Sequence, residues 1–224
     1  MSEYLLINIM ILAIPLVLSF EKNLRFYTKL PYYFFSLVFV STAYIIWDSI
    51  ATVRGDWGFN PDYLTGIYLF SLPLEEILFF ITVPYSCLFI YETVNFYIKD
   101  KRLSINRYYL AVPVILLLIN AYIFNFQHYT LTVSLYAASF FLISFLYNRL
   151  ITSRNFWITI FITYIPFLIV NYILTSVPIV TYNPEAFWNI RITTIPLEDF
   201  IYSFSMIALW ILFYELGKTL LRKK

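Results

Sequence analysis

Residues 71–80 read SLPLEEILFF, and residues 194–203 read TIPLEDFIYS. In both stretches a Pro-Leu pair is followed by two adjacent acids, and an apolar run begins there. Proline followed by acidic residues in the first turn is typical of a helix N-terminus. The two stretches therefore predict a pair of matching helix starts, each with two acids at the end of an otherwise apolar helix.

The two motifs belong to a longer repeat with a constant offset of 123 residues. Residues 48–92 align with residues 171–215 without a gap, and Asp48 corresponds to Asn171 and Glu76 to Asp199. Prolines and polar residues recur at Thr52/Thr175, Asn60/Asn183, Pro61/Pro184, Pro73/Pro196, Glu75/Glu198 and Glu92/Glu215. Because shared prolines and polar residues are rare in so apolar a chain, this register predicts an internal duplication.

The composition predicts a membrane protein. The chain is 61% hydrophobic and only 12% charged, whereas soluble domains are roughly 45–50% apolar and about 25% charged. Its apolar runs approach the ~20 residues that cross a ~30 Å hydrocarbon core. We expect an all-α polytopic bundle of about seven transmembrane helices, near residues 4–20, 32–53, 67–91, 108–124, 129–147, 156–176 and 196–216.

The basic residues predict the orientation of this bundle in the cell membrane. Seven spans with the N-terminus outside and the C-terminus in the cytoplasm place all but Arg54 and Arg191 of the 15 lysines and arginines inside. This agrees with the excess of basic residues in cytoplasmic loops. The first apolar run lacks a basic n-region and a small-residue cleavage site, so we expect it to be a retained span.

The offset predicts a plan of three spans, a linker span and three spans. Residues 1–107 form the first repeat, residues 108–125 the linker span and residues 126–224 the second repeat. The first span matches the fifth through a slightly different offset, 125, which aligns Ser19 with Ser144. Both copies then run in the same direction, which is a parallel repeat about an axis along the membrane normal.

Several kinds of chemistry are disfavoured by what the sequence contains. A single cysteine, Cys87, leaves no partner for an intrachain disulfide, and the lone His128 makes a zinc site improbable. The four scattered glycines form neither a dinucleotide-binding nor a phosphate-binding loop. The basic residues do not form a nucleic-acid surface. We therefore expect no metal and no cofactor, although a need for reduced flavin stays open.

The acids of the repeat are the candidate catalytic residues. Helix geometry at about 1.5 Å per residue places six polar side chains at similar depth in the outer half, namely Asp48, Glu75, Glu76, Asn171, Glu198 and Asp199. Carboxylates in lipid cost about 2.5–3.5 kcal/mol each, so they face the bundle interior. Glu75 and Glu198 are expected to face a cavity, and capping is a stronger alternative for Glu76 and Asp199. Crowded carboxyls in a dry cavity share protons, which makes one a proton donor.

Such a cavity suits the acid-catalysed rearrangement of an alkene. A carboxylic acid protonates a double bond, a second double bond attacks the cation, and a carboxylate removes a proton. Aromatic rings stabilise the passing cation, and candidates are Trp47, Trp57, Phe79, Phe80, Tyr202 and Phe204. Asn60, Asn171 and Asn183 are further candidate substrate-binding residues. The expected substrate is a long polyene dissolved in the lipid bilayer.

The runs IIWDSIATVRGDWGFNPDYL (45–64), SLPLEEILFF (71–80) and IPLEDF (195–200) resemble the lycopene cyclase family that lacks a flavin-binding domain. The resemblance covers nearly the whole chain, with both Pro-x-Glu-(Glu/Asp) motifs fused in one polypeptide. It implies an isomerase, or intramolecular lyase, that closes the linear ends of lycopene to β-rings. γ-Carotene would be the intermediate and β-carotene the product. We hypothesise that Glu75 or Glu198 delivers the proton.

Other functions share parts of this pattern. A small membrane transporter also has three-plus-one-plus-three repeats, but its typical site lies at the midplane with a Pro-Gln kink. A retinal pigment needs a lysine deep in the last span, and an intramembrane prenyltransferase needs clustered aspartates on the cytoplasmic side. Cyclases acting on elongated carotenoids, or making ε- or γ-rings, fit equally well. The sequence leaves open which acid is the donor and whether the chain forms a homodimer.

Overall fold

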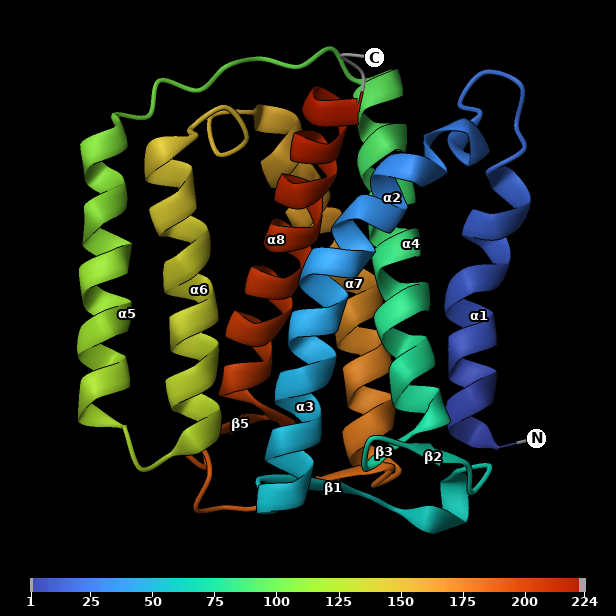
Figure 1. Ribbon diagram of the computed structural model, residues 1–224, viewed down its shortest axis with the longest axis vertical. Coiled ribbons are helices and arrows are strands. Elements are labelled where there is room, and N and C mark those ends of the chain that lie inside the picture. The colour runs from blue at the N-terminus through green and yellow to red at the C-terminus, as the bar shows by residue number, and fades with distance from the viewer. Residues whose placement is uncertain (1, 222–224) are drawn as a thin grey trace.

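The computed structural model of the chain describes residues 2–221. Met1, Arg222, Lys223 and Lys224 lie outside the described residues, and with them the basic C-terminal end of the predicted topology. Long helices lie side by side, and short strands gather at one end of the bundle, the lower end in Figure 1. We call this the strand end.

The helices follow the predicted order along the chain. The second predicted span is one helical stretch, Phe26–Arg54, in which a π-helical turn (Leu37–Ser41) separates α2 (Leu30–Ser36) from α3 (Thr42–Arg54). The other helices are α1 (Glu3–Leu18), α4 (Leu74–Tyr97), α5 (Ala111–Ile123), α6 (His128–Leu146), α7 (Arg154–Ser176) and α8 (Leu197–Leu221).

The described residues form a mostly helical bundle, as predicted, and its apolar helices support a membrane location. Among the described residues, five helical stretches are long and apolar enough to cross a membrane: Phe26–Arg54, α4, α6, α7 and α8. Two shorter apolar helices, Glu3–Leu18 and Arg107–Ile123, complete the set. In hydrocarbon every backbone N–H and C=O group needs a hydrogen-bond partner within the protein, and a helix supplies these partners.

Short strands at the strand end were not expected from the sequence. They are β1 (Trp57–Phe59), β2 (Tyr68–Leu69), β3 (Leu72–Pro73), β4 (Val180–Tyr182), β5 (Arg191–Ile192) and β6 (Ile195–Pro196). The predicted helix start at residue 67 is therefore wrong, because β2 and β3 form a hairpin and α4 begins at Leu74. Phe70 and Ser71 turn this hairpin with φ of 51° and 69°. Both φ values are positive, as in a type I′ turn, but Phe-Ser lacks its Asn-Gly signature.

We call residues 1–107 and residues 126–224 the two parts of the chain. The pairing of β1 with β4 joins these two parts. The strands are antiparallel, with Gly58 opposite Thr181 at the centre and Trp57 and Phe59 opposite Tyr182 and Val180. Gly58 and Thr181 are 123 residues apart, which is the offset found in the sequence. The ribbon is therefore centred on a pair of corresponding positions.

The long helices of the two parts interlock. α1 packs on α4, and α6 packs on α8, whereas α2 packs on α8 and α7 packs on α4. Each middle helix thus lies against the last helix of the other part. α5 packs on α6 at the margin of the bundle (Figure 1). Because the contacts cross between the parts, the core between α4 and α8 needs both.

A carboxylate also links three helical segments at the end away from the strands. The buried Glu92 of α4 forms salt bridges with Lys29 and Lys218 and accepts a 2.9 Å hydrogen bond from Tyr214 Oη. Its repeat counterpart Glu215 is more exposed and pairs at 2.7 Å with Lys218, three residues further along α8. These two glutamates occupy corresponding positions, but Glu92 connects different helices whereas Glu215 pairs within its own helix.

Glu92→Gln should lower the free energy of unfolding by about 1–3 kcal/mol, because it removes the negative charge and one of the two acceptor oxygens that face Lys29, Lys218 and Tyr214. Glu215→Gln is the matched control and should cost at most about 1 kcal/mol, as for an exposed pair. Denaturant titration in mild detergent measures both values. Equal effects of the two substitutions would contradict the proposed linking role of Glu92.

Candidate active site

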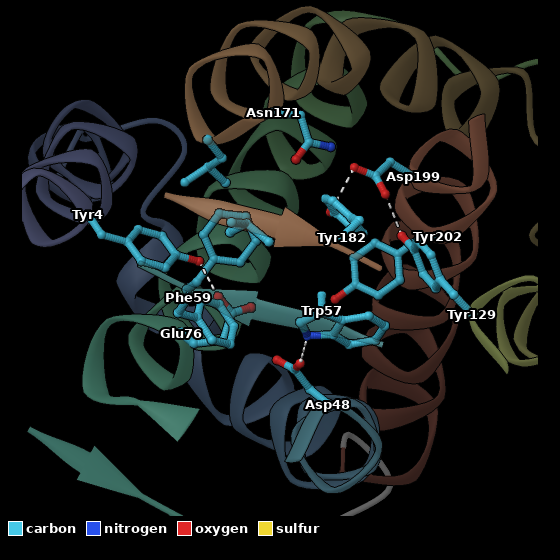
Figure 2. A pocket seen from close by; sticks show the side chains of 13 residues that line it. Tyr4, Asp48, Trp57, Phe59, Glu76, Tyr129, Asn171, Tyr182, Asp199 and Tyr202 are labelled. Carbon is cyan, nitrogen blue, oxygen red and sulfur yellow. Dashed lines mark hydrogen bonds between the residues drawn. The ribbon is translucent and has the colours of Figure 1, made fainter. Parts of the chain in front are cut away.

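A small cavity lined by carboxyl and aromatic side chains lies beneath the β1–β4 ribbon and between the helices at the strand end (Figure 2). We call it the acid chamber. It has a volume of about 60 Å³ and is lined by Tyr4, Asp48, Trp57, Phe59, Glu76, Phe79, Tyr129, Asn171, Leu174, Val180, Tyr182, Asp199 and Tyr202. The four residues from the ribbon form one wall, so the strands position part of the site.

Three carboxyl groups face the acid chamber from three different helices. Asp48 comes from α3, Glu76 from the first turn of α4 and Asp199 from the first turn of α8, and all three are buried. Asn171 of α7, the repeat counterpart of Asp48, faces the same space. The structure thus brings together four of the six polar side chains that the sequence predicted to converge.

Each of these carboxyl groups receives a hydrogen bond from an aromatic side chain. Tyr4 Oη donates to Glu76, and Tyr129 Oη donates to Asp199 Oδ1 at 2.5 Å. Trp57 Nε1 donates to Asp48 Oδ1 at 2.7 Å. Figure 2 shows these donors around the chamber wall. Because a buried polar group needs a partner, the aromatic donors stabilise acids that face an otherwise apolar interior.

Tyr182 supplies a second donor to Asp199, with Oη 3.0 Å from Oδ2. Tyr182 lies in β4, outside the membrane-spanning helices. Burial, and then the nearby Asp199 carboxylate, raise the pKa of the Tyr182 phenol well above its usual value. The phenol therefore stays protonated across the physiological range and remains a hydrogen-bond donor.

The orientation expected within each acid pair is reversed. Glu75 and Glu198 do not line the acid chamber but point back toward the loops that precede their helices. Glu75 Oε1 accepts from the backbone N–H of Thr65 at 2.6 Å, and Glu198 Oε1 accepts from that of Trp188 at 2.7 Å. The hairpins fold these loops over the helix starts, so the first acid braces the loop and the second faces inward.

Hydroxyl donors complete the environment of the bracing acids. Ser2 Oγ donates to Glu75 at 2.8 Å, and Thr130 Oγ1 donates to Glu198 at 2.6 Å. The second carboxyl oxygen of each glutamate is buried without a hydrogen-bond partner among residues 2–221. Glu75 and Glu198 therefore have structural surroundings that match each other and differ from those of the chamber acids.

Some of the candidate substrate-binding residues line the chamber, and others lie outside it. Trp57, Phe79, Asn171 and Tyr202 line the chamber. Trp47 lies behind it, with its ring centroid 5.3 Å from that of Trp57, and Phe80 is fully buried in the core. Phe204 packs in an aromatic cluster with Phe140, Phe141 and Trp157.

Asn60 and Asn183 do not reach the chamber. Asn60 Oδ1 accepts from the backbone N–H of Asp62, and Asn183 Oδ1 accepts from that of Glu185, each at 3.1 Å. Both asparagines thus shape turns, which is a common role for asparagine before proline-containing loops. Their recurrence in the sequence reflects two similar turns, and neither side chain lines the acid chamber.

Sequence reasoning identified Tyr202 but missed the other three tyrosines that line the chamber. Tyr4, Tyr129 and Tyr182 line the chamber and donate to its acids. Tyr4 and Tyr129 are 125 residues apart, the offset that aligns Ser19 with Ser144. Extending that offset toward the N-terminus would have identified this pair. Tyr182 gave no such signal, because its counterpart in the repeat is Phe59.

A larger apolar cavity of about 270 Å³ adjoins the acid chamber. We call it the apolar groove, and it lies between α1, α4, α7 and α8. Phe79, Asn171 and Tyr202 line both spaces, and we call these three shared residues the neck. Among residues 2–221, no cluster of three or more His, Cys, Asp or Glu side chains is arranged to hold a metal ion.

The protein-family comparison matches both parts of the chain. A family model described as lycopene cyclase aligns with residues 2–94 and 127–216. The chain belongs to the lycopene cyclase family. The matched segments contain all the chamber acids and omit α5. No curated protein and no solved structure matches the chain. Membership of the lycopene cyclase family supports a role as a carotenoid cyclase enzyme in a membrane.

The bracing role of the first acids predicts a local effect on the loops. Glu75→Ala and Glu198→Ala should each lower the free energy of unfolding by about 1–3 kcal/mol, because buried donors lose their acceptor. Hydrogen exchange should accelerate at the amides of Thr65 and Trp188, respectively. Glu75→Gln and Glu198→Gln keep an acceptor oxygen and should have smaller effects. Unchanged exchange at both amides in the alanine variants would contradict the bracing role.

Proposed function

We propose that this member of the lycopene cyclase family closes the linear ends of lycopene to β-rings with the acids of the acid chamber. γ-Carotene is then the intermediate and β-carotene the product. The observation that supports this most directly is the convergence of three buried carboxyls on a chamber that shares three lining residues with an apolar groove. A proton donor and acceptor lie at one end, and space for a hydrocarbon at the other.

The proposed reaction is an isomerisation in which atoms and electrons balance. A protonated chamber acid transfers its proton to the terminal double bond of lycopene, leaving a tertiary carbocation. The π electrons of the neighbouring internal double bond attack this cation, which forms the ring bond and moves the positive charge to a ring carbon. A chamber carboxylate then removes a proton from the adjacent carbon, which restores one double bond. One proton enters and one leaves.

Within each pair of adjacent acids, we now assign the catalytic role to the second acid and not to the first. Glu76, Asp199 and Asp48 face the chamber, so we assign proton delivery and removal to these three instead of Glu75 and Glu198. The lining residues include neither lysine nor arginine. Arg191 lies outside the chamber, over the ring of Tyr182 at 5.6 Å from its centroid, and Tyr182 donates to Asp199. An acid buried without a cation beside it is neutralised by a proton and by hydrogen bonds, which is the state a proton donor requires.

Aromatic rings surround the path of the positive charge. Trp57, Phe79 and Tyr202 present ring surfaces to the chamber, and the Trp57 ring packs 5.1 Å from that of Tyr129. The negative face of an aromatic ring attracts a cation, with an energy of about 2 kcal/mol or more in a desolvated site. These rings would stabilise the carbocation without reacting with it.

We further propose that the bundle is a three-plus-one-plus-three parallel repeat of seven spans, with α5 as the linker span. The ribbon centred on Gly58 and Thr181 supports this plan, and so do the two segments of the family match. The strand end then faces the exterior, since the basic loops lie at the other ends of the helices. Lycopene would arrive from the lipid bilayer.

Expression of the chain in bacteria that accumulate lycopene tests the proposal. We expect β-carotene to form without a second protein. Glu76→Gln, Asp48→Asn and Asp199→Asn should each lower ring formation by about 100-fold or more, the typical contribution of general acid–base catalysis. Chromatography of the pigments measures ring number and type, and immunoblots normalise for the amount of protein.

Glu215→Gln is the control for this series, because Glu215 lies at the opposite end of α8 from Asp199. It should retain nearly full ring formation. Full activity of Glu76→Gln and Asp199→Asn combined in one chain would contradict the proposed mechanism. Formation of ε-rings would contradict the proposed site of proton removal while leaving the cyclisation itself intact.

A further inference from the structure

The apolar groove opens toward the lipid-facing surface between α1 and α7. Met10 and Ile14 of α1 line the groove, yet they are 67% and 69% exposed. From this rim the groove passes between α4 and α8 to the neck at Phe79, Asn171 and Tyr202. A hydrocarbon could therefore move from the bilayer to the acids without crossing water.

The groove wall stays apolar although a proline interrupts the helix beside it. Pro15 has no N–H to donate to the carbonyl oxygen of Ile11 four residues earlier. Ser86 Oγ of α4 lies 3.0 Å from that oxygen and 2.9 Å from the carbonyl oxygen of Thr82, so its one hydroxyl hydrogen is shared between these two acceptors. Since this contact pairs the free carbonyl, the groove presents little unpaired polarity to a ligand.

The corresponding space on the other side of the bundle is filled by large side chains. With the offset of 123 on α4 and α8, Ser86 and Cys87 correspond to Leu209 and Trp210, and Trp210 is fully buried. With the same offset, Val170 of α7 corresponds to Trp47 of α3.

Side chains from α3 and α6 close this second space. Ile11 of α1 corresponds, at the offset of 125, to Tyr136 of α6. The rings of Trp47 and Tyr136 are 5.4 Å apart, and Tyr136 stacks on Tyr44 at 4.2 Å. Tyr136 Oη also donates to the backbone oxygen of Ala43 at 3.1 Å. The repeat thus has an open side and a closed side.

We propose that the apolar groove is a one-sided lateral portal and binding site for a linear polyene chain. The terminal double bond reaches the chamber, the next segment lies in the groove, and the rest extends into lipid. This inference rests on the proposed function and adds the route and direction of substrate binding. The groove volume of about 270 Å³ is just below the ~300–1,000 Å³ of typical ligand pockets, which suits a chain end better than a whole carotenoid.

One-sided access has a consequence for the order of events. The two ends of lycopene cannot occupy the open side together, so each end enters in its own binding event. The half-cyclised product must withdraw and turn before its second end reacts. A duplicated bundle that handles a symmetric substrate would then use its two halves for one active site, not for two.

Photocrosslinking tests the portal directly. The photoreactive residue p-benzoylphenylalanine would replace Met10 on the open side or Leu135, its counterpart at the offset of 125, on the closed side. Met10 and Leu135 are both exposed to lipid, at 67% and 46%, so lycopene dissolved in the bilayer gives each a similar background. After irradiation in lycopene-containing membranes, mass spectrometry of the full chain should show several-fold more lycopene adduct at position 10. Equal adduct at the two positions would overturn the portal.

A substitution that copies the closed side provides the second test. Val170→Trp, which places at the groove the residue found at position 47, should lower cyclisation at least tenfold. Leu168→Trp on the same helix is the control, because Leu168 is 41% exposed and does not line the groove. It should retain near-normal activity. Equal activity of the two variants, with both folded, would count against the portal, and crosslinking decides the matter if Val170→Trp fails to fold.

The two tests separate this inference from the proposed function. Preferred adduct at position 10 without any ring formation would support the polyene-binding groove and contradict the cyclase reaction. Ring formation together with equal adduct at positions 10 and 135 would support the reaction and overturn the portal.

Discussion

The site depends on hydrogen bonds from aromatic side chains to carboxyl groups inside an apolar bundle. A carboxylate at the centre of a membrane-spanning helix costs about 2.5–3.5 kcal/mol, which is an upper limit for acids in a first turn, and one hydrogen bond to a charged group contributes about 1.5–3 kcal/mol. The single donors Tyr4 and Trp57 therefore offset much of the cost for Glu76 and Asp48, and Asp199 has two donors. Aromatic residues suit this task because their rings pack in the core while one polar atom reaches the acid.

This constraint explains why the strand end has so much local structure. Trp57 and Tyr182 can reach the acids only if the chain between helices is held over the bundle, and the β1–β4 ribbon holds both. The loops are in turn fixed by Glu75 and Glu198, which accept from loop amides. Each pair of adjacent acids thus combines two tasks: the first fixes the loop, and the second faces the chamber that the loop helps to close.

Much of the fold and part of the site could be predicted from the sequence. Apolar runs identified the helices. The offset of 123 identified corresponding positions, because recurring prolines and acids are easily recognised in an apolar chain. Side-chain direction could not be predicted, since Glu75 and Glu76 differ by one position in the same helical turn. The hairpins decide between them, and a Phe-Ser turn carries no recognisable hairpin signal. Tyr182 was missed because its hydroxyl has no counterpart in Phe59.

The central claim is that a chamber acid gives its proton to the carbon skeleton of the substrate. Conversion of lycopene in membranes equilibrated with deuterated water tests this most directly, because buried acids exchange with solvent before they react. Mass spectrometry of the purified cyclic product should show one carbon-bound deuterium for each ring formed. Rings that contain no deuterium would contradict the account, since the ring-closing proton would then not come from an exchangeable acid.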